Sequence, residues 1–305
     1  MGVHRRGYRR YDGPLTPERW RFWILAQYAF GKVFHARLLV IFYVICFVPT
    51  VLALAAVYIT HNVDLLTAMF PGAQFPKTEL VNEGFFLFLM AVQATLSVFV
   101  TALIGPGLVS PDLTNNALPL FFSRPFSRAQ YVLGKFSVLF ILLSLITAAP
   151  MLLIYVVKSA LSGSQWFIDN IHLAFASLVG SLLWVVLISL VALASSAWVR
   201  WRPAAAGMMF ALFFIPAGFG AAANEIMQMT WGSLLNGTVL IGTVWNSLFF
   251  INDPVGYAKA ADALSEMPDS IGFLPAWSAW LMVIALCGAS LFLLNRKIRA
   301  HEVVR

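Results

Sequence analysis

The sequence predicts an all-α polytopic membrane protein with six transmembrane helices, an N-terminal interfacial helix, and a re-entrant or outer helical segment before the last span. The first observation is composition, because 60% of the 305 residues are hydrophobic and only 11% are charged, whereas an average soluble domain carries about 25% charged residues. The second is a set of apolar runs long enough to cross a bilayer, which takes about 20 residues. The third is the placement of Lys and Arg around those runs.

The apolar runs give the spans of a transmembrane domain covering 38–294. The predicted spans are 38–60, 84–109, 136–157, 171–199, 204–223 and 276–294. The first run contains Ala53-Leu54-Ala55, which resembles a signal-peptide cleavage site. Its apolar stretch is longer than the about 7–15 residues of a signal peptide and encloses the site. We therefore interpret this run as a retained span.

The basic residues indicate the orientation of the chain. With six spans and the N-terminus inside, the cytoplasmic segments hold all of the 20 Lys and Arg residues except Lys77, Lys158 and Lys259. This is the asymmetry that the positive-inside rule describes. The net charge of +7 then reflects topology, and we expect no nucleic-acid partner. Both the N-terminus and the C-terminal tail, 295–305, are expected in the cytoplasm.

The N-terminal part, residues 1–37, is predicted to be cytoplasmic and to contain an interfacial amphipathic helix. Thr16-Pro17-Glu18 is typical of a helix start. One face of the following helix carries polar residues and the other is mainly aromatic: Arg21, Tyr28, Lys32 and His35 against Trp20, Trp23, Phe30 and Phe34. Such a helix would place its aromatic residues in the headgroup boundary and its cations toward water. The alternative is an N-terminal extension that only anchors the first span.

One stretch before the last span, Ile226–Ile251, is moderately apolar but interrupted. The interruptions are Gly232, Asn236, Gly237, Gly242 and Asn246. As a seventh span it would move the basic tail to the outer side, against the positive-inside rule. We therefore expect the segment 224–275 to be extracytoplasmic or re-entrant, with a seventh span as the alternative. Non-helical backbone at membrane depth requires cover by protein or water.

The connection between the second and third spans, 110–135, is the most informative segment. Ser110 and Asp112 can cap the start of a short helix, and Arg124 and Arg128 would share a face if they lay on one helical turn. A strongly apolar surface accompanies them: Leu118, Leu120, Phe121, Phe122 and Phe126. Apolar residues that emerge from a span indicate contact with a membrane surface or with a protein partner.

This connection resembles that of the membrane subunits of ABC-2 type transporters, a class that includes many bacterial exporters. The likeness lies in a Gly-rich span end, the acidic Asp112, and two stretches of the motif: Phe122-Ser123-Arg124-Pro125-Phe126-Ser127-Arg128 and Tyr131-Val132-Leu133-Gly134-Lys135. The N-terminal helix, the six spans and the broken segment extend it over the whole chain. Many members carry Gly-x-Leu-Glu where this chain has Ala117-Leu118-Pro119-Leu120, so no role of that glutamate is carried over.

The resemblance implies a permease subunit of an ATP-driven exporter in a bacterial cytoplasmic (inner) membrane. Its expected partners are a separate ABC ATP-binding subunit, a second permease copy or homologue, and membrane lipids. The residues expected to couple to the ATPase are Asp112, Arg124, Pro125, Ser127, Arg128 and Lys135. The alternative is that the basic residues among them only mark topology.

No nucleotide site of the chain's own is expected. Neither Gly31-Lys32 nor Gly134-Lys135 fits the phosphate-binding pattern G-x-x-x-x-G-K-[ST]. We therefore expect no enzyme activity and no cofactor in this chain, with ATP and Mg bound by the partner subunit. Scattered His and Cys residues give no metal site.

Three polar residues lie four apart within the second span: Gln93, Ser97 and Thr101. They either line a transport pathway or form hydrogen bonds between helices. The spans hold almost no ionisable residues, which argues against an ion-coupled pump. The alternatives to an ABC permease are an ATP-independent membrane scaffold and a secondary transporter.

Overall fold

The computed structural model describes residues 17, 20–63, 81–123, 126–199, 201–227, 230–250 and 274–299. Within these ranges the chain forms helices and no strand, which confirms the all-α prediction. By length and composition, six helical runs of this described part can cross a membrane: Arg37–His61, Glu83–Thr114, Arg128–Ser162, Ile171–Trp198, Pro203–Met227 and Ala276–Ile298. They coincide with the six predicted spans. The second and third continue further into their connection than expected.

Three spans consist of two helices in succession, and a proline explains each break. The pairs are α2 (Arg37–Ile45) with α3 (Val48–His61), α5 (Glu83–Ile104) with α6 (Pro106–Thr114), and α8 (Arg128–Ile146) with α9 (Ala148–Ser162). Pro49, Pro106 and Pro150 each lie in the first turn of the second helix. Proline has no backbone N–H to donate and clashes with the preceding turn, so it is best tolerated in the first turn of a helix. A hydrogen bond connects the first helices of the first and third pairs: the Tyr43 hydroxyl of α2 donates to the Leu142 carbonyl of α8 at 2.7 Å.

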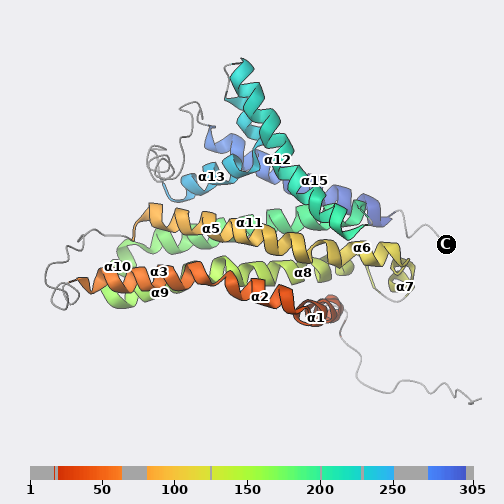
Figure 1. The fold of residues 1–305 in the computed structure, drawn as a ribbon, viewed down its shortest axis with the longest axis horizontal. Coiled ribbons are helices and arrows are strands. Elements are labelled where there is room, and N and C mark those ends of the chain that lie inside the picture. Colours follow the sequence, from red (N-terminus) through yellow and green to blue (C-terminus); the bar gives the residue numbers. More distant parts are fainter. Residues whose placement is uncertain are drawn as a thin grey trace, which may run out of the picture.

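The divided spans and α11 (Ile171–Trp198) lie side by side as a long bundle (Figure 1). α11 packs against α5, α6, α8 and α9 on one side and against later helices on the other. These later helices are α12 (Arg202–Met227), α13 (Gly237–Leu248) and α15 (Ala276–Arg299). η2 (Trp231–Leu235) packs mainly on α12, and α10 (Ser164–Asp169) joins α9 to α11. α12 leans away from the bundle (Figure 1). In its most apolar stretch 17% of residues are buried, against 72% in α11, so α11 is the centre of the fold.

The stretch before the last span is broken as predicted. η2 folds back onto α12, where the Asn224 side chain accepts from the Gly232 N–H at 2.7 Å and donates to Ser233 at 2.8 Å. A Cβ added at Gly220 or Gly232 would overlap the carbonyl of the other glycine, so the two backbones touch. α13 has 12 residues, too few for a crossing that needs about 20. Its re-entrant placement stays a prediction, and residues 251–273, with Lys259, lie outside the described residues, as does Lys77.

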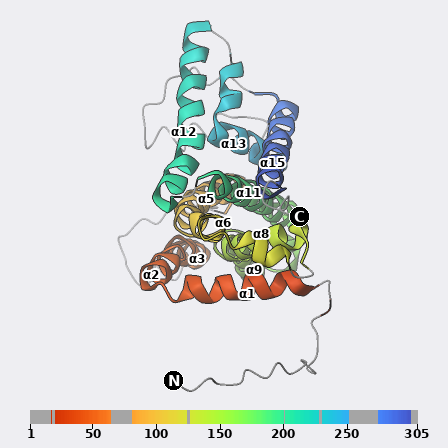
Figure 2. The same ribbon diagram turned by 90° about the vertical axis from the view of Figure 1, so that its right-hand side faces the viewer.

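The N-terminal helix α1 (Arg21–Phe34) crosses one end of the bundle, roughly perpendicular to its long axis (Figure 2). It packs mainly on α8. The close approach needs Gly134, because a Cβ there would lie 2.8 Å from the Phe22 carbonyl oxygen and 3.2 Å from Leu25. The described helix begins at Arg21, whereas Thr16 and Glu18 of the predicted helix start lie outside the described residues.

Candidate functional site

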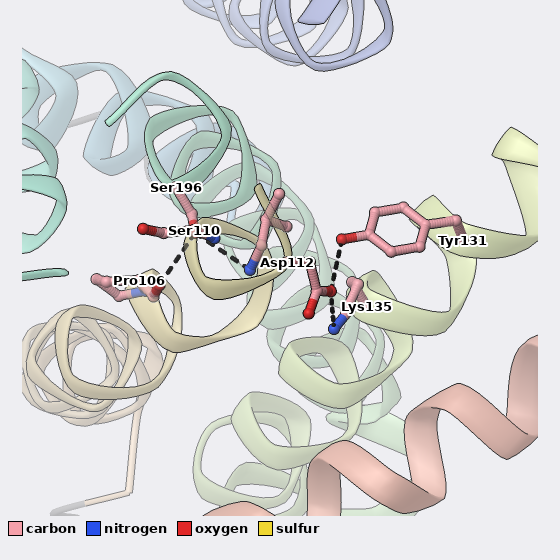
Figure 3. Close-up of polar contacts among 7 residues, drawn as sticks. Pro106, Ser110, Asp112, Tyr131, Lys135 and Ser196 are labelled. Atoms are coloured by element: carbon pink, nitrogen blue, oxygen red, sulfur yellow. Dashed lines mark hydrogen bonds and ion pairs between the residues drawn. The ribbon is translucent and has the colours of Figure 1, made fainter. Parts of the chain in front are cut away.

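A cluster of one acid, one base and one phenol joins α6 to α8 at the end of the bundle near α1. The Lys135 ammonium of α8 lies 2.7 Å from Asp112 Oδ2 of α6, and the Tyr131 hydroxyl donates to the same oxygen at 2.8 Å (Figure 3). The ammonium also lies 5.5 Å from the centre of the Tyr131 ring. Tyr131 and Lys135 are four residues apart, so one face of α8 presents both to α6.

The cluster is largely removed from solvent. The side chains of Lys135 and Asp112 are 9% and 20% exposed, and Tyr131 is fully buried. A buried charge is tolerated when it is paired and hydrogen-bonded, and here the carboxylate has both kinds of partner. The sequence identified Asp112 and Lys135 separately as coupling residues, and the structure brings them together. The role of Tyr131 was missed, although its spacing from Lys135 within the motif is a usable signal.

α6 is held in place by a serine of α11. The buried Ser196 hydroxyl accepts from the backbone N–H groups of Val109 at 3.3 Å and Ser110 at 3.0 Å, and it donates to the Pro106 carbonyl at 3.2 Å (Figure 3). Buried backbone polar groups near a helix break need such partners. Residues Ser110 and Asp112 were predicted to cap a helix start, which is wrong. They lie inside α6, because the helix resumes at Pro106 directly after α5.

A short helix and a capped turn connect α6 to α8. α7 (Leu118–Phe122) precedes Arg124 and Pro125, both of which lie outside the described residues. Ser127 then caps α8: its hydroxyl accepts from the Gln130 N–H at 3.2 Å, while the Gln130 side chain accepts from the Ser127 N–H at 3.0 Å. This reciprocal arrangement is a capping box.

The backbone of Ser127 is extended, with φ −83° and ψ 156°. Arg128 therefore begins a new helix, and the single helical turn considered for Arg124 and Arg128 is wrong. The coupling roles of Ser127 and Arg128 stay predictions.

The polar stripe of α5 faces other helices. Gln93 donates to the Thr50 hydroxyl of α3 at 2.8 Å, and Ser97 accepts from the Trp184 indole N–H of α11 at 2.8 Å. Ser97 and Thr101 donate to carbonyls of their own helix, each at 2.6 Å. All three are buried. Gln93 Nε2 and Ser97 thus make contacts between helices, Thr101 bonds within its own helix, and Gln93 Oε1 has no hydrogen-bond partner among the described residues. The role of the stripe as a pathway lining stays a prediction.

The described residues include no group of three or more His, Cys, Asp or Glu side chains that could hold a metal ion. A scan of the sequence against models of protein families gives no match, and a search of curated proteins gives none either.

Proposed function

We propose that this chain is the transmembrane permease subunit of an ABC-2 type ATP-driven transporter, working as an exporter with a separate ATP-binding subunit. The observation that carries the proposal is the motif of residues 105–135, in a chain without a phosphate-binding loop of its own. A second permease copy or a homologue completes the transporter. ATP and Mg bind the partner subunit, and the N- and C-termini face the cytoplasm of a bacterial cell.

The arrangement of the motif supports this role. Leu120 of α7 is 71% exposed at the turn between two helices that continue into the membrane domain. An exposed apolar side chain beyond a span suits a protein partner. A subunit that binds α7 and the segment Arg124–Arg128 acts on α6 and α8 together, because the pair of Asp112 with Lys135 joins them. α1, α5 and α9 then receive the movement through direct packing.

The test is a charge reversal in the connecting turn, Arg124→Glu with Arg128→Glu. We expect membrane insertion to persist, since the other cytoplasmic cations still set the orientation. Co-purification with the co-expressed ATP-binding subunit should be lost, or ATP turnover should no longer follow transport in reconstituted vesicles. The control is Arg296→Glu with Arg305→Glu, which makes the same charge change in the predicted cytoplasmic tail. Unchanged association and coupling in the first variant would reduce these arginines to topology markers.

One observation favours a secondary transporter as the second candidate. Asp112 and Lys135 are ionisable, largely buried and located within helical runs long enough to span a membrane, and such residues mark ion or proton pathways. The two candidates differ in their energy source. Transport that continues without ATP and stops when the proton gradient is collapsed would support the second candidate, whereas transport that requires the ATPase subunit supports the first. A membrane scaffold would show neither.

A further inference from the structure

A cavity of about 860 Å³ lies between α1 and the ends of the membrane helices. Its walls come from α1, the start of α2, the end of α5, α6, α7 and α8. The volume falls within the range of about 300–1,000 Å³ that is typical of ligand pockets. The cavity includes Asp112 and Lys135 of the cluster described above, whereas Leu120, the exposed side chain of α7, does not line it.

The cavity combines apolar walls with positive charge. Among the described residues that line it, Arg21, Lys32 and Lys135 are basic and Asp112 is the one acid. Asp112 is paired with Lys135, so Arg21 and Lys32 are the lining cations outside that pair. Most of the remaining lining is aliphatic: Ile24, Leu25, Ala29, Val33, Leu39, Leu103, Ile104 and Leu108. The ligand that matches this lining is amphipathic and negatively charged.

The cavity lies at the level where the spans end. Leu39, Leu103 and Ile104 belong to helical runs that can cross the membrane, whereas Arg21 and Lys32 belong to the crossing helix α1. The cations Arg21 and Lys32 were predicted to face water, but the space that they line is shared with the spans. A lipid with its acyl chain along the spans and its headgroup beside α1 would match this change from an apolar to a basic lining.

We propose that this cavity binds an anionic phospholipid from the leaflet in which α1 lies. Lys32 and Arg21 contact its phosphate, and the aliphatic wall formed by α2, α5 and α6 contacts the upper part of its acyl chains. Basic pockets between transmembrane helices bind anionic headgroups in this way. The apolar lining favours a lipid over a soluble anion. The proposal does not depend on the transport function, since it needs only the six membrane spans.

The experiment measures lipid retention by the purified full-length protein in detergent, using native mass spectrometry. Phosphatidylglycerol and phosphatidylcholine with identical acyl chains are offered in turn. We expect preferential retention of phosphatidylglycerol and about fivefold weaker retention in Lys32→Gln, because one cation near an anionic headgroup contributes about that factor. The matched control is Arg37→Gln, which removes a nearby exposed cation that does not line the cavity; its retention should be unchanged.

A second pair of variants tests the cavity itself without changing charge. A Cβ added at Gly107, which lines the cavity, meets no atom within 4 Å. Gly107→Leu should therefore fill part of the space and displace the lipid, whereas Gly107→Ala should retain it. Circular dichroism verifies that helix content is equal. Equal retention of the two lipids by the native chain, equal losses in Lys32→Gln and Arg37→Gln, or displacement of the lipid by inorganic phosphate would each overturn the proposal.

Discussion

Two of the groups of buried polar side chains in the described part of this protein make different kinds of contact. The stripe on α5, formed by Gln93, Ser97 and Thr101, is neutral, and two of its hydroxyls donate to carbonyls of their own helix. The end cluster of Asp112, Tyr131 and Lys135 is charged, and both of its strong contacts converge on one carboxylate oxygen. A neutral hydroxyl within a helix can find a partner locally, but a buried charge requires a particular partner from another helix. The stripe therefore tolerates change more readily than the cluster does.

The largest expected effect comes from Lys135→Met, which leaves the Asp112 carboxylate without its cation. Removing one partner of a buried pair costs about 3–5 kcal/mol, and we expect about 3 kcal/mol because Asp112 retains its bond to Tyr131 and some solvent contact. Denaturant unfolding in mixed micelles, followed by tryptophan fluorescence, measures the change in unfolding free energy. Adding Asp112→Leu should restore much of the loss, which a double-mutant cycle quantifies. A single-variant cost below about 1 kcal/mol would mean that the pair is effectively solvated.

A smaller effect is expected from Gly134→Ala, which tests how the end cluster is covered by α1. The added methyl group would meet the Phe22 carbonyl, and overpacking of this kind costs about 1–3 kcal/mol. Gly207→Ala in α12 is the matched control, because its Cβ meets nothing within 4 Å. That variant should be neutral or stabilising by up to about 1 kcal/mol, since alanine favours a helix over glycine. Cross-linking between cysteines introduced in α1 and α8 would report the displacement, and equal behaviour of the two variants would contradict the close packing.

The smallest effect is expected from Ser97→Ala in the stripe. It removes the acceptor of the Trp184 indole N–H, and hydrogen bonds between membrane helices contribute about 0.6 kcal/mol on average. Unfolding in micelles should therefore change by less than 1 kcal/mol, with a shift in Trp184 emission. If Ser97→Ala or Gln93→Leu instead alters transport while leaving stability unchanged, the stripe lines a pathway, and the contrast with the end cluster disappears.

The spans could be predicted from sequence because apolar length is a local property. The fourth span, predicted as 171–199, is the helix Ile171–Trp198. The ends of the second and third spans, predicted at 109 and 136, were missed because the charged residues Asp112 and Lys135 look like loop residues. Pro106 is tolerated in the first turn of α6, and Asp112 is neutralised by Lys135 from a different helix. No periodic pattern marks such a long-range pair.

The candidate site was predicted in its residue types but not in its contacts. Gly134 belongs to the motif, but the close packing that requires a glycine there comes from Phe22, which is distant in the sequence. Ser196 carries no local signal at all, because its three backbone partners belong to another span. Arg124 and Pro125 lie outside the described residues. A sequence pattern predicts the helix in which it lies, whereas the contacts of a site between helices depend on how those helices pack.

The divided spans have a kinematic consequence for the fold. Tyr43 and Leu142, which are bonded to each other, lie about one turn before the breaks that precede α3 and α9, and beyond those breaks α3 packs on α9. The two breaks therefore share one level, before which the Tyr43 hydrogen bond joins α2 to α8 and beyond which α3 packs on α9. We expect a tilt of α8 to act on α2 through this hydrogen bond, while α3 and α9 can stay in place. The part of the fold that would move includes Lys135 of α8 and the helix α1, which packs on α8.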